Sequence, residues 1–255
     1  MKITICGKGG SGKSSITVLV ARALSKHSKV YIFDSDESNT LLPRMLGVNA
    51  PRPIVEYLGG KKNIFKEGEV NLVKALSTAG HGIELDSLPQ EYLSAPLENV
   101  RLLSIGKIRE FGEGCACSFN FITRALLKNL ALKEDEHVLV DTDAGMEYVG
   151  RSVIEGIDAF LAVGDPTAES LVLLNTLRES AVSLGKKFWL VLNKVTPEIA
   201  DRLRKKAGEI GLEVSGVVNF DKEIFNSGLD GSPLKAGEAL ADVQNVLKNV
   251  GLITS

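Results

Sequence analysis

A glycine-rich octapeptide, Gly7–Ser14 (GKGGSGKS), most constrains how this chain folds. It follows a short apolar segment at 2–6 and opens a segment of helical apolar periodicity at 14–24. Glycines let the backbone curl with its N–H groups turned inward, and a helix N-terminus adds partial positive charge. The spacing G-x4-G-K-S in this context predicts a P-loop that binds nucleotide phosphates. The residues expected to contact the nucleotide here are Gly9, Gly10, Ser11, Gly12, Lys13, Ser14 and Ser15.

Lys8 distinguishes this loop from an ordinary P-loop, in which one lysine, here Lys13, contacts the β- and γ-phosphates. Lys8 lies too early in the loop to reach the same nucleotide easily. The run K-G-G-x-G-K-S resembles the deviant Walker A motif of the MinD/ParA/nitrogenase-iron-protein class of ATPases. The resemblance implies that Lys8 is catalytic together with Lys13, and that it reaches the nucleotide of a second copy, so that a dimer encloses two ATP molecules. A solvated lysine at the loop mouth is the alternative interpretation.

Size and charge narrow the class of protein. The chain has 255 residues, of which 44% are hydrophobic, which suits one sizeable globular domain over 1–255. The net charge is -2 and no Lys/Arg stripe occurs, so we expect no nucleic-acid partner. No segment reaches the ~18 apolar residues of a membrane span. With only three cysteines and no leader sequence, we expect a cytoplasmic protein that binds no membrane.

Strand-like and helix-like segments alternate along the chain. The alternation predicts an α/β fold, a P-loop NTPase three-layer α/β/α sandwich with a mostly parallel, seven- or eight-stranded sheet. Residues 47–99 are interpreted as an insertion on the nucleotide face and not as a separate domain. Strands are expected at 2–6, 29–33, 100–105, 137–141, 158–163, 188–192 and 213–218, and helices at 13–26, 118–130, 167–184, 197–208 and 238–249.

Carboxylates follow two of these strands, at the edge where ligands bind in parallel sheets. Asp34 and Asp36 end the second strand, and such a pair is costly unless it faces water, a metal or each other. The resemblance implies that Asp36 is a catalytic switch I aspartate that positions the attacking water, and that Asp34 supports Mg²⁺. A polar turn with a helix cap is the alternative.

The strand at 137–141 ends in Asp141, as a Walker B strand does. We expect Asp141 to hold a water of Mg²⁺ while the Ser14 hydroxyl binds the ion directly. The following residues resemble switch II, in which the Gly145 N–H is available to a γ-phosphate oxygen. A small residue is needed there because the backbone itself approaches the ligand.

The sixth expected strand leads into Asn193, Lys194, Val195 and Thr196. Guanine-binding NTPases carry N-K-x-D, and Thr196 cannot supply the carboxylate that pairs with guanine. The amide of Asn193 can satisfy adenine, so the sequence predicts ATP and ADP as ligands, with Asn193 and Lys194 in the nucleotide site. Residues around Asn219 and Phe220 are expected on the other side of the base.

Cys115 and Cys117 form a C-x-C pair between an expected strand and an expected helix. In an extended segment residues i and i+2 point to the same side, so both thiols can face one ion. Zinc takes four ligands, and nickel accepts four in a plane. A two-fold dimer doubles any patch near its axis, so two pairs would make a Cys₄ site at the interface. Two buried thiols are the alternative, and Cys6 is assigned to the core.

The segments G-E-G-C-A-C at 112–117 and D-T-D-A-G-M-E-Y-V-G-R at 141–151, together with the deviant P-loop, resemble the CooC-type ATPases that mature nickel carbon monoxide dehydrogenase. The resemblance covers most of the chain. It implies a metal, zinc or nickel, shared by Cys115 and Cys117 of two subunits, and a nickel carbon monoxide dehydrogenase as client. Tyr148 stands where the family usually has a histidine. This difference concerns the identity of the client enzyme and leaves the prediction of an ATPase unchanged. Glu147 and Arg151 match the family and also suit a helical ion pair.

The sequence thus favours an ATP-hydrolysing, homodimeric metallochaperone. A MinD/ParA-type positioning ATPase is one alternative, and it predicts a membrane tail or a basic DNA-binding face, neither of which is apparent. A nitrogenase-iron-protein-like electron donor is another, and its cluster ligands lie far apart in sequence, unlike C-x-C.

Overall fold

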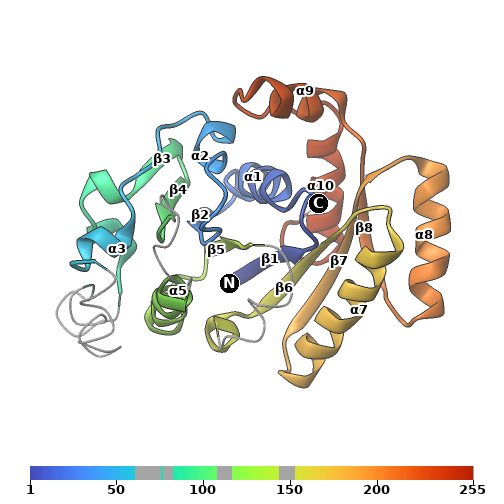
Figure 1. Ribbon diagram of the computed structural model, residues 1–255, viewed down its shortest axis with the longest axis horizontal. Coiled ribbons are helices and arrows are strands. Elements are labelled where there is room, and N and C mark those ends of the chain that lie inside the picture. The colour runs from blue at the N-terminus through green and yellow to red at the C-terminus, as the bar shows by residue number, and fades with distance from the viewer. Residues whose placement is uncertain (61–75, 77–82, 108–116, 144–152, 255) are drawn as a thin grey trace.

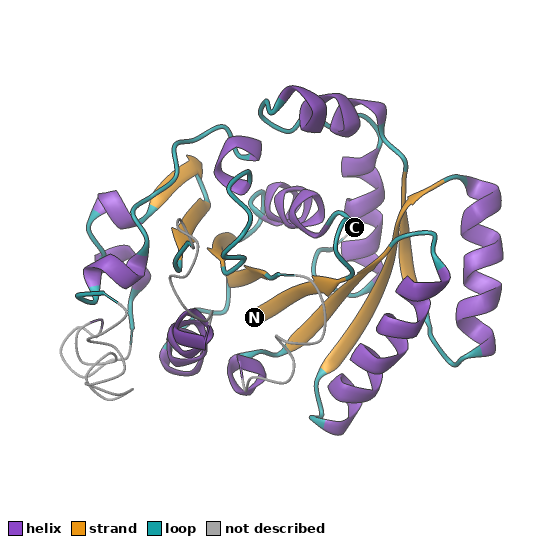
Figure 2. Ribbon diagram, viewed as in Figure 1, coloured by secondary structure: helices purple, strands orange, loops and turns teal. Residues whose placement is uncertain are grey.

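One eight-stranded sheet organises the molecule, with helices on both of its faces (Figures 1 and 2). The computed structural model describes residues 1–60, 76, 83–107, 117–143 and 153–254. The strand order is β3-β4-β2-β5-β1-β6-β7-β8. Neighbouring strands pair in parallel, except that β3 runs antiparallel to β4. The α/β fold with a mostly parallel sheet is therefore confirmed.

The expected strands and helices are all present, with ends shifted by a few residues. The strands are β1 Lys2–Gly7, β2 Lys29–Asp34, β3 Ser94–Leu97, β4 Val100–Ser104, β5 Glu136–Asp141, β6 Ala159–Gly164, β7 Lys187–Val195 and β8 Val214–Asn219. The α-helices are α1 Lys13–Leu24, α2 Leu42–Met45, α3 Ile54–Tyr57, α5 Cys117–Asn129, α7 Ala168–Ser183, α8 Pro197–Glu209, α9 Lys222–Asp230 and α10 Ala239–Asn249. Short 3-10 turns are η1 Leu85–Ser87, η2 Gln90–Tyr92 and η3 Val153–Gly156.

Two apolar clusters lie on opposite faces of the sheet. Along β6, Phe160 and Ala162 belong to the cluster that includes α5, α7 and α8, whereas Leu161 and Val163 belong to the cluster that includes α1 and α10. This alternation follows the two-residue period of a strand. The strands between the two helical layers are therefore buried on both sides. Their polar residues lie at the carboxyl ends of the parallel strands.

Cys6 packs in the core as expected, and burial raises the pKa of its thiol to about 12. A thiol in this state is a small apolar side chain and not a metal ligand at neutral pH.

The sequence did not predict α9, the short helix α2 or β3. The ends of α9 are nevertheless well marked. Asp221 precedes it, and its Oδ1 accepts from the N–H groups of Glu223 and Ile224, while Gly231 follows it with a φ of 60°. These are the usual cap residues of a helix. Within 47–99, β3 adds an antiparallel strand at the sheet edge, and placement of that region on the nucleotide face stays a prediction.

Candidate functional site

The glycine-rich loop joins β1 to α1, and two of its glycines have no substitute. Gly7 has a φ of 143°, and a Cβ there would lie 2.3 Å from the carbonyl oxygen of Val163. Gly12 has a φ of 96°, and its Cβ would lie 2.4 Å from Nδ2 of Asn193. Gly12 caps α1 without a side-chain hydrogen bond, so the helix N-terminus is open to an anion.

Lys13 is held over this loop. Its side chain is buried, and Nζ donates to the carbonyl oxygens of Gly7 at 3.4 Å and Lys8 at 3.3 Å. Both hydrogen bonds are long and go to neutral acceptors. A phosphate offers shorter, charge-assisted bonds, so Lys13 is placed to exchange these carbonyls for a ligand.

Asp141 lies at the end of β5, fully buried beside the start of α1. Its Oδ2 accepts from the Ser14 hydroxyl at 2.7 Å, and its Oδ1 from the Thr17 hydroxyl at 2.9 Å. Burial raises the pKa of Asp141 to about 6 although both hydrogen bonds lower it. A hydroxyl beside a carboxylate is a donor set that suits Mg²⁺. The structure thus brings Ser14 and Asp141 together, and their role as magnesium ligands stays a proposal.

Asp34 is the second buried carboxylate at this edge. Lys107, in the loop after β4, donates from Nζ to Oδ1 of Asp34 at 2.8 Å. Oδ2 is buried and has no hydrogen-bond partner within the described ranges. Burial raises the pKa of Asp34 to about 7, Lys107 lowers it, and Asp141 and Asp36 raise it further. The supporting role of Asp34 towards Mg²⁺ stays a proposal.

Asp36 lies in a turn beyond β2. Its Oδ1 accepts from the Ser38 N–H at 2.9 Å, the Ser38 hydroxyl at 2.7 Å and the Asn39 N–H at 3.0 Å. Asn39 in turn donates from Nδ2 to the Ser14 hydroxyl at 2.9 Å. The turn is therefore tied to the loop that would bind the nucleotide, and the catalytic role of Asp36 stays a prediction.

Lys8 pairs with a residue outside its own loop. Its Nζ forms an ion pair of 2.7 Å with Glu169 in the first turn of α7, and this hydrogen bond raises the pKa of Lys8. The two side chains are 27% and 75% exposed, so the pair is weak and easily exchanged.

Asn193 and Lys194 end β7 and support the glycine-rich loop. Asn193 donates from Nδ2 to the Ser11 carbonyl oxygen, and Lys194 donates from Nζ to that of Gly10, both at 2.8 Å. Lys194 has a φ of 60°, which turns the chain at this point. The structure therefore shows contacts that hold the loop, and the base-reading role of Asn193 stays a prediction.

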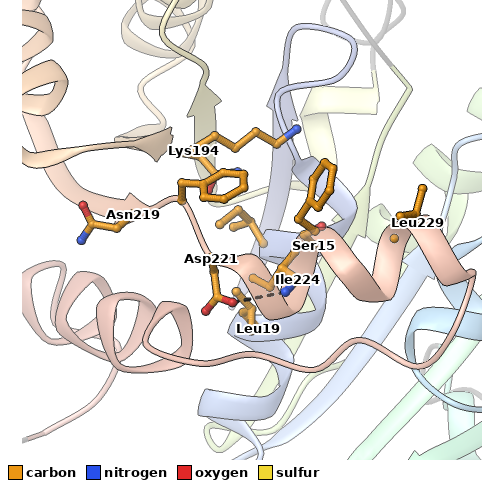
Figure 3. Close-up of a pocket in the computed structure, with 12 residues that line it drawn as sticks. Ser15, Leu19, Lys194, Asn219, Asp221, Ile224 and Leu229 are labelled. Carbon is orange, nitrogen blue, oxygen red and sulfur yellow. Dashed lines mark hydrogen bonds between the residues drawn. The ribbon is translucent and has the colours of Figure 1, made fainter.

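A cavity of about 470 Å³ opens beside the loop, between α1 and α9 (Figure 3). Its walls are mostly apolar, and Ser15, Asn193 and Lys194 form the side next to the loop. The remaining lining residues are Ile16, Leu19, Asn219, Phe220, Asp221, Ile224, Phe225, Gly228 and Leu229. An apolar cavity with a few polar groups is typical of a site for a planar ring.

Several predicted residues fall outside the described part of the chain. They are Cys115, Gly145, Glu147, Tyr148 and Arg151, together with the side chain of Cys117, whose backbone begins α5. Among the described residues no group of three or more His, Cys, Asp or Glu side chains could hold a metal ion. The thiol site thus stays a proposal.

Sequence reasoning missed three residues that the site contains. Thr17 lies three residues after Ser14 on α1, so both side chains are on the same face of the helix. This spacing could have identified Thr17 as a second hydroxyl near Asp141. Asn39 and Lys107 carry no such local signal, because their partners are brought close only by the tertiary fold.

A strand, a glycine-rich loop and a helix, with Ser14 bonded to a buried aspartate beside them, define a P-loop ATPase. The chain belongs to the CobQ/CobB/MinD/ParA nucleotide binding domain family, whose model matches residues 2–234.

Two relatives and one solved structure are similar to this chain. It is 42% identical over 250 residues to an ATP-binding protein of Methanocaldococcus jannaschii, covering 97% of this chain and 98% of that protein. It is 31% identical over 268 residues to the carbon monoxide dehydrogenase accessory protein CooC of Rhodospirillum rubrum, covering 98% of each. The septum site-determining protein MinD of Pyrococcus horikoshii, solved with Mg-ADP, shares the fold with a TM-score of 0.68 and 18% identity, over 98% of this chain and 95% of that chain.

None of the helices in the described part of the chain combines the length and the apolar composition needed to cross a bilayer.

Proposed function

We propose that this ATPase is a homodimeric metallochaperone that supplies nickel to a carbon monoxide dehydrogenase. The observation that carries the proposal is a C-x-C pair, Cys115 and Cys117, in a chain that is 31% identical to CooC over 98% of its length. In the proposed closed dimer, two pairs provide four thiolates for one transported Zn²⁺ or Ni²⁺ ion.

ATP binding and hydrolysis at the nucleotide site are proposed to drive the closing and reopening of this dimer. We infer that Ser14, Asp141 and Asp34 hold Mg²⁺, which neutralises the phosphate charge when it is bound. Lys13 turns from the loop carbonyls to the phosphates, and Asp36 orients the attacking water. The Gly145 N–H is proposed to donate to a γ-phosphate oxygen. Lys8 leaves the exposed Glu169 and contacts the nucleotide of the second copy.

The cavity between α1 and α9 is proposed to receive the adenine base. Its apolar walls suit the faces of a purine, and the amide of Asn193 on its lining is proposed to meet the ring edge. Asn219 also lines the cavity, but its Nδ2 donates to Asp242. Phe220 and Phe225 have ring centroids 6.0 Å apart and side chains more than half exposed. Stacking on the base would bury them.

Binding of metal and binding of ATP must support each other if both favour the closed dimer, because coupling between two sites is reciprocal. We expect Zn²⁺ or Ni²⁺ to tighten the binding of a slowly hydrolysed ATP analogue by roughly ten-fold or more. Anaerobic calorimetry with and without one metal ion per two chains measures this effect.

The matched control is the double variant Cys115→Ser and Cys117→Ser, in which the metal is expected to leave ATP affinity unchanged. Equal ATP affinity of the wild-type protein with and without metal would contradict the proposal. Co-sedimentation with liposomes and with DNA addresses the positioning function, and we expect neither to bind. Sedimentation that requires ATP would favour a MinD/ParA-type role instead.

A further inference from the structure

Lys107 occupies an unusual position for a lysine. It lies three residues beyond β4, and its side chain is only 13% exposed. Its Nζ donates to Oδ1 of Asp34 at 2.8 Å and to the main-chain carbonyl oxygens of Asp36 and Asn39. An ammonium group has three donors, so all three are used on partners about seventy residues away in the sequence.

The backbone that carries Lys107 is itself fixed. Asp34 pairs with Ser104 in the sheet, and the Ile105 N–H donates to the Asp34 carbonyl oxygen at 3.1 Å. At Gly106, an added Cβ would lie 2.2 Å from the ring of Phe119 in α5, so the loop packs closely against that helix. Lys107 is therefore held in a fixed position near the carboxyl ends of β2 and β4, and it is not a solvated surface lysine.

The two carbonyl groups that Lys107 binds bracket a single turn, Asp36 to Asn39. Inside this turn, Oδ1 of Asp36 accepts from the backbone N–H groups of Ser38 and Asn39. At its far end the Asn39 side chain donates to the Ser14 hydroxyl. A shift of the turn would therefore move both the Asp36 carboxylate and the contact with Ser14.

The positive charge of Lys107 also acts electrostatically on the Asp36–Asn39 turn. Asp34, Asp36 and Asp141 influence one another electrostatically at this edge. The Lys107 ammonium contacts Asp34 directly, and it screens part of the repulsion that would push Asp36 outward.

We propose that Lys107 is a positioning residue for ATP hydrolysis, which holds the Asp36–Asn39 turn so that the Asp36 carboxylate faces the nucleotide. The inference rests on the proposed role of Asp36 in the ATPase reaction, and it requires neither the thiol site nor a client enzyme. The hydrogen bonds of Lys107 do not go to the glycine-rich loop or to the cavity between α1 and α9, and they reach Ser14 only through Asn39. Its loss should therefore affect turnover far more than nucleotide binding.

The test compares Lys107→Met with Lys26→Met, a control at an exposed lysine just beyond α1. We expect Lys107→Met to lower kcat by roughly 100-fold, because small displacements of a catalytic group have effects of this size. The dissociation constant for ATP should change less than about three-fold. Hydrogen exchange should become faster at the amides of Ser38 and Asn39 and stay unchanged in α1. Lys107→Arg, which keeps the charge and the donors, should recover part of kcat, and the control should behave as wild type.

Wild-type kcat in Lys107→Met, or an equal loss of kcat and of ATP affinity, would overturn the proposal. Where the Met variant does not fold, Lys107→Gln supplies the same comparison with a side chain of similar length. The variant Asp36→Asn separates the proposed catalytic role of Asp36 from the proposed positioning role of Lys107. Full activity in that variant would remove the role of Asp36, while the exchange rates of Ser38 and Asn39 still report whether Lys107 holds the turn.

Discussion

Lys8 and Lys13 belong to the same loop but have different surroundings. Lys13 is buried over the loop carbonyls, whereas Lys8 is paired with Glu169 at the surface. We expect Lys8→Ala to keep its affinity for ATP and to lose hydrolysis, by about 1000-fold or more if the lysine acts as arginine fingers do. A steady-state phosphate-release assay, combined with nucleotide titration, measures both quantities.

Glu169→Gln is the matched control for Lys8. The ion pair between Lys8 and Glu169 is exposed and therefore weak, so removal of Glu169 should change the rate less than about five-fold. Substantial turnover in Lys8→Ala would show that the lysine has no catalytic role.

The buried carboxylates make stability depend on pH. Burial raises the pKa of Asp34 to about 7 and that of Asp141 to about 6, whereas an aspartate in the unfolded chain has a pKa near 4. Between these values the folded state binds more protons than the unfolded state, so the free energy of unfolding falls as pH rises. We expect the metal-free protein to lose up to a few kcal/mol between about pH 4 and about pH 7 from these groups.

Urea unfolding at several pH values, for wild type and Asp34→Asn, measures this dependence. The variant should show a flatter profile, because one of the raised groups is absent. Comparison of the two proteins cancels the contributions of other groups, such as His137, whose pKa burial lowers to about 4. Parallel profiles would contradict the assignment of Asp34 as a carboxylate destabilised by burial.

Among the elements, α9 most directly links stability to the proposed base cavity. Asp221 caps it and also accepts from the N–H groups of Gly237 and Ala239 through Oδ2. Although its partial burial opposes ionisation, these backbone hydrogen bonds hold the pKa of Asp221 below its usual value. We expect Asp221→Ala to lower the free energy of unfolding by about 1–2 kcal/mol.

The same change should raise the KM for ATP several-fold, because α9 carries Phe225 and Leu229 on the wall of the cavity. Thermal unfolding and steady-state kinetics measure the two effects. Asp230→Ala, at the exposed other end of α9, serves as the control and should leave both quantities near wild type. An unchanged KM in a destabilised Asp221→Ala would separate α9 from the nucleotide site.

The sequence predicted the structure best where the residues of one strand, loop or helix form a recognisable pattern by themselves. The parallel strands were predictable from their apolar runs, and the P-loop from its glycine spacing. By contrast, α9 is short and contains Ser227 and Gly228, which weaken a helical pattern, and β3 contains Pro96, which argues against a strand. Lys107 could not be assigned because β4 lies beside β2 only in the folded sheet.

For the whole molecule, we propose that one chain contains half of each reactive centre. In the structure Lys8 forms its ion pair with Glu169 of α7, outside its own loop. A C-x-C pair provides two of the four ligands that a closed zinc site needs, so pairing of two chains would complete both centres.

Anaerobic light scattering with metal analysis, with and without ATP, tests this claim most directly. We expect wild type to form a dimer that holds about one metal ion per two chains in the presence of ATP. The Cys115→Ser and Cys117→Ser double variant should lose the ion. A chain that stays monomeric while it hydrolyses ATP at its full rate would contradict the account.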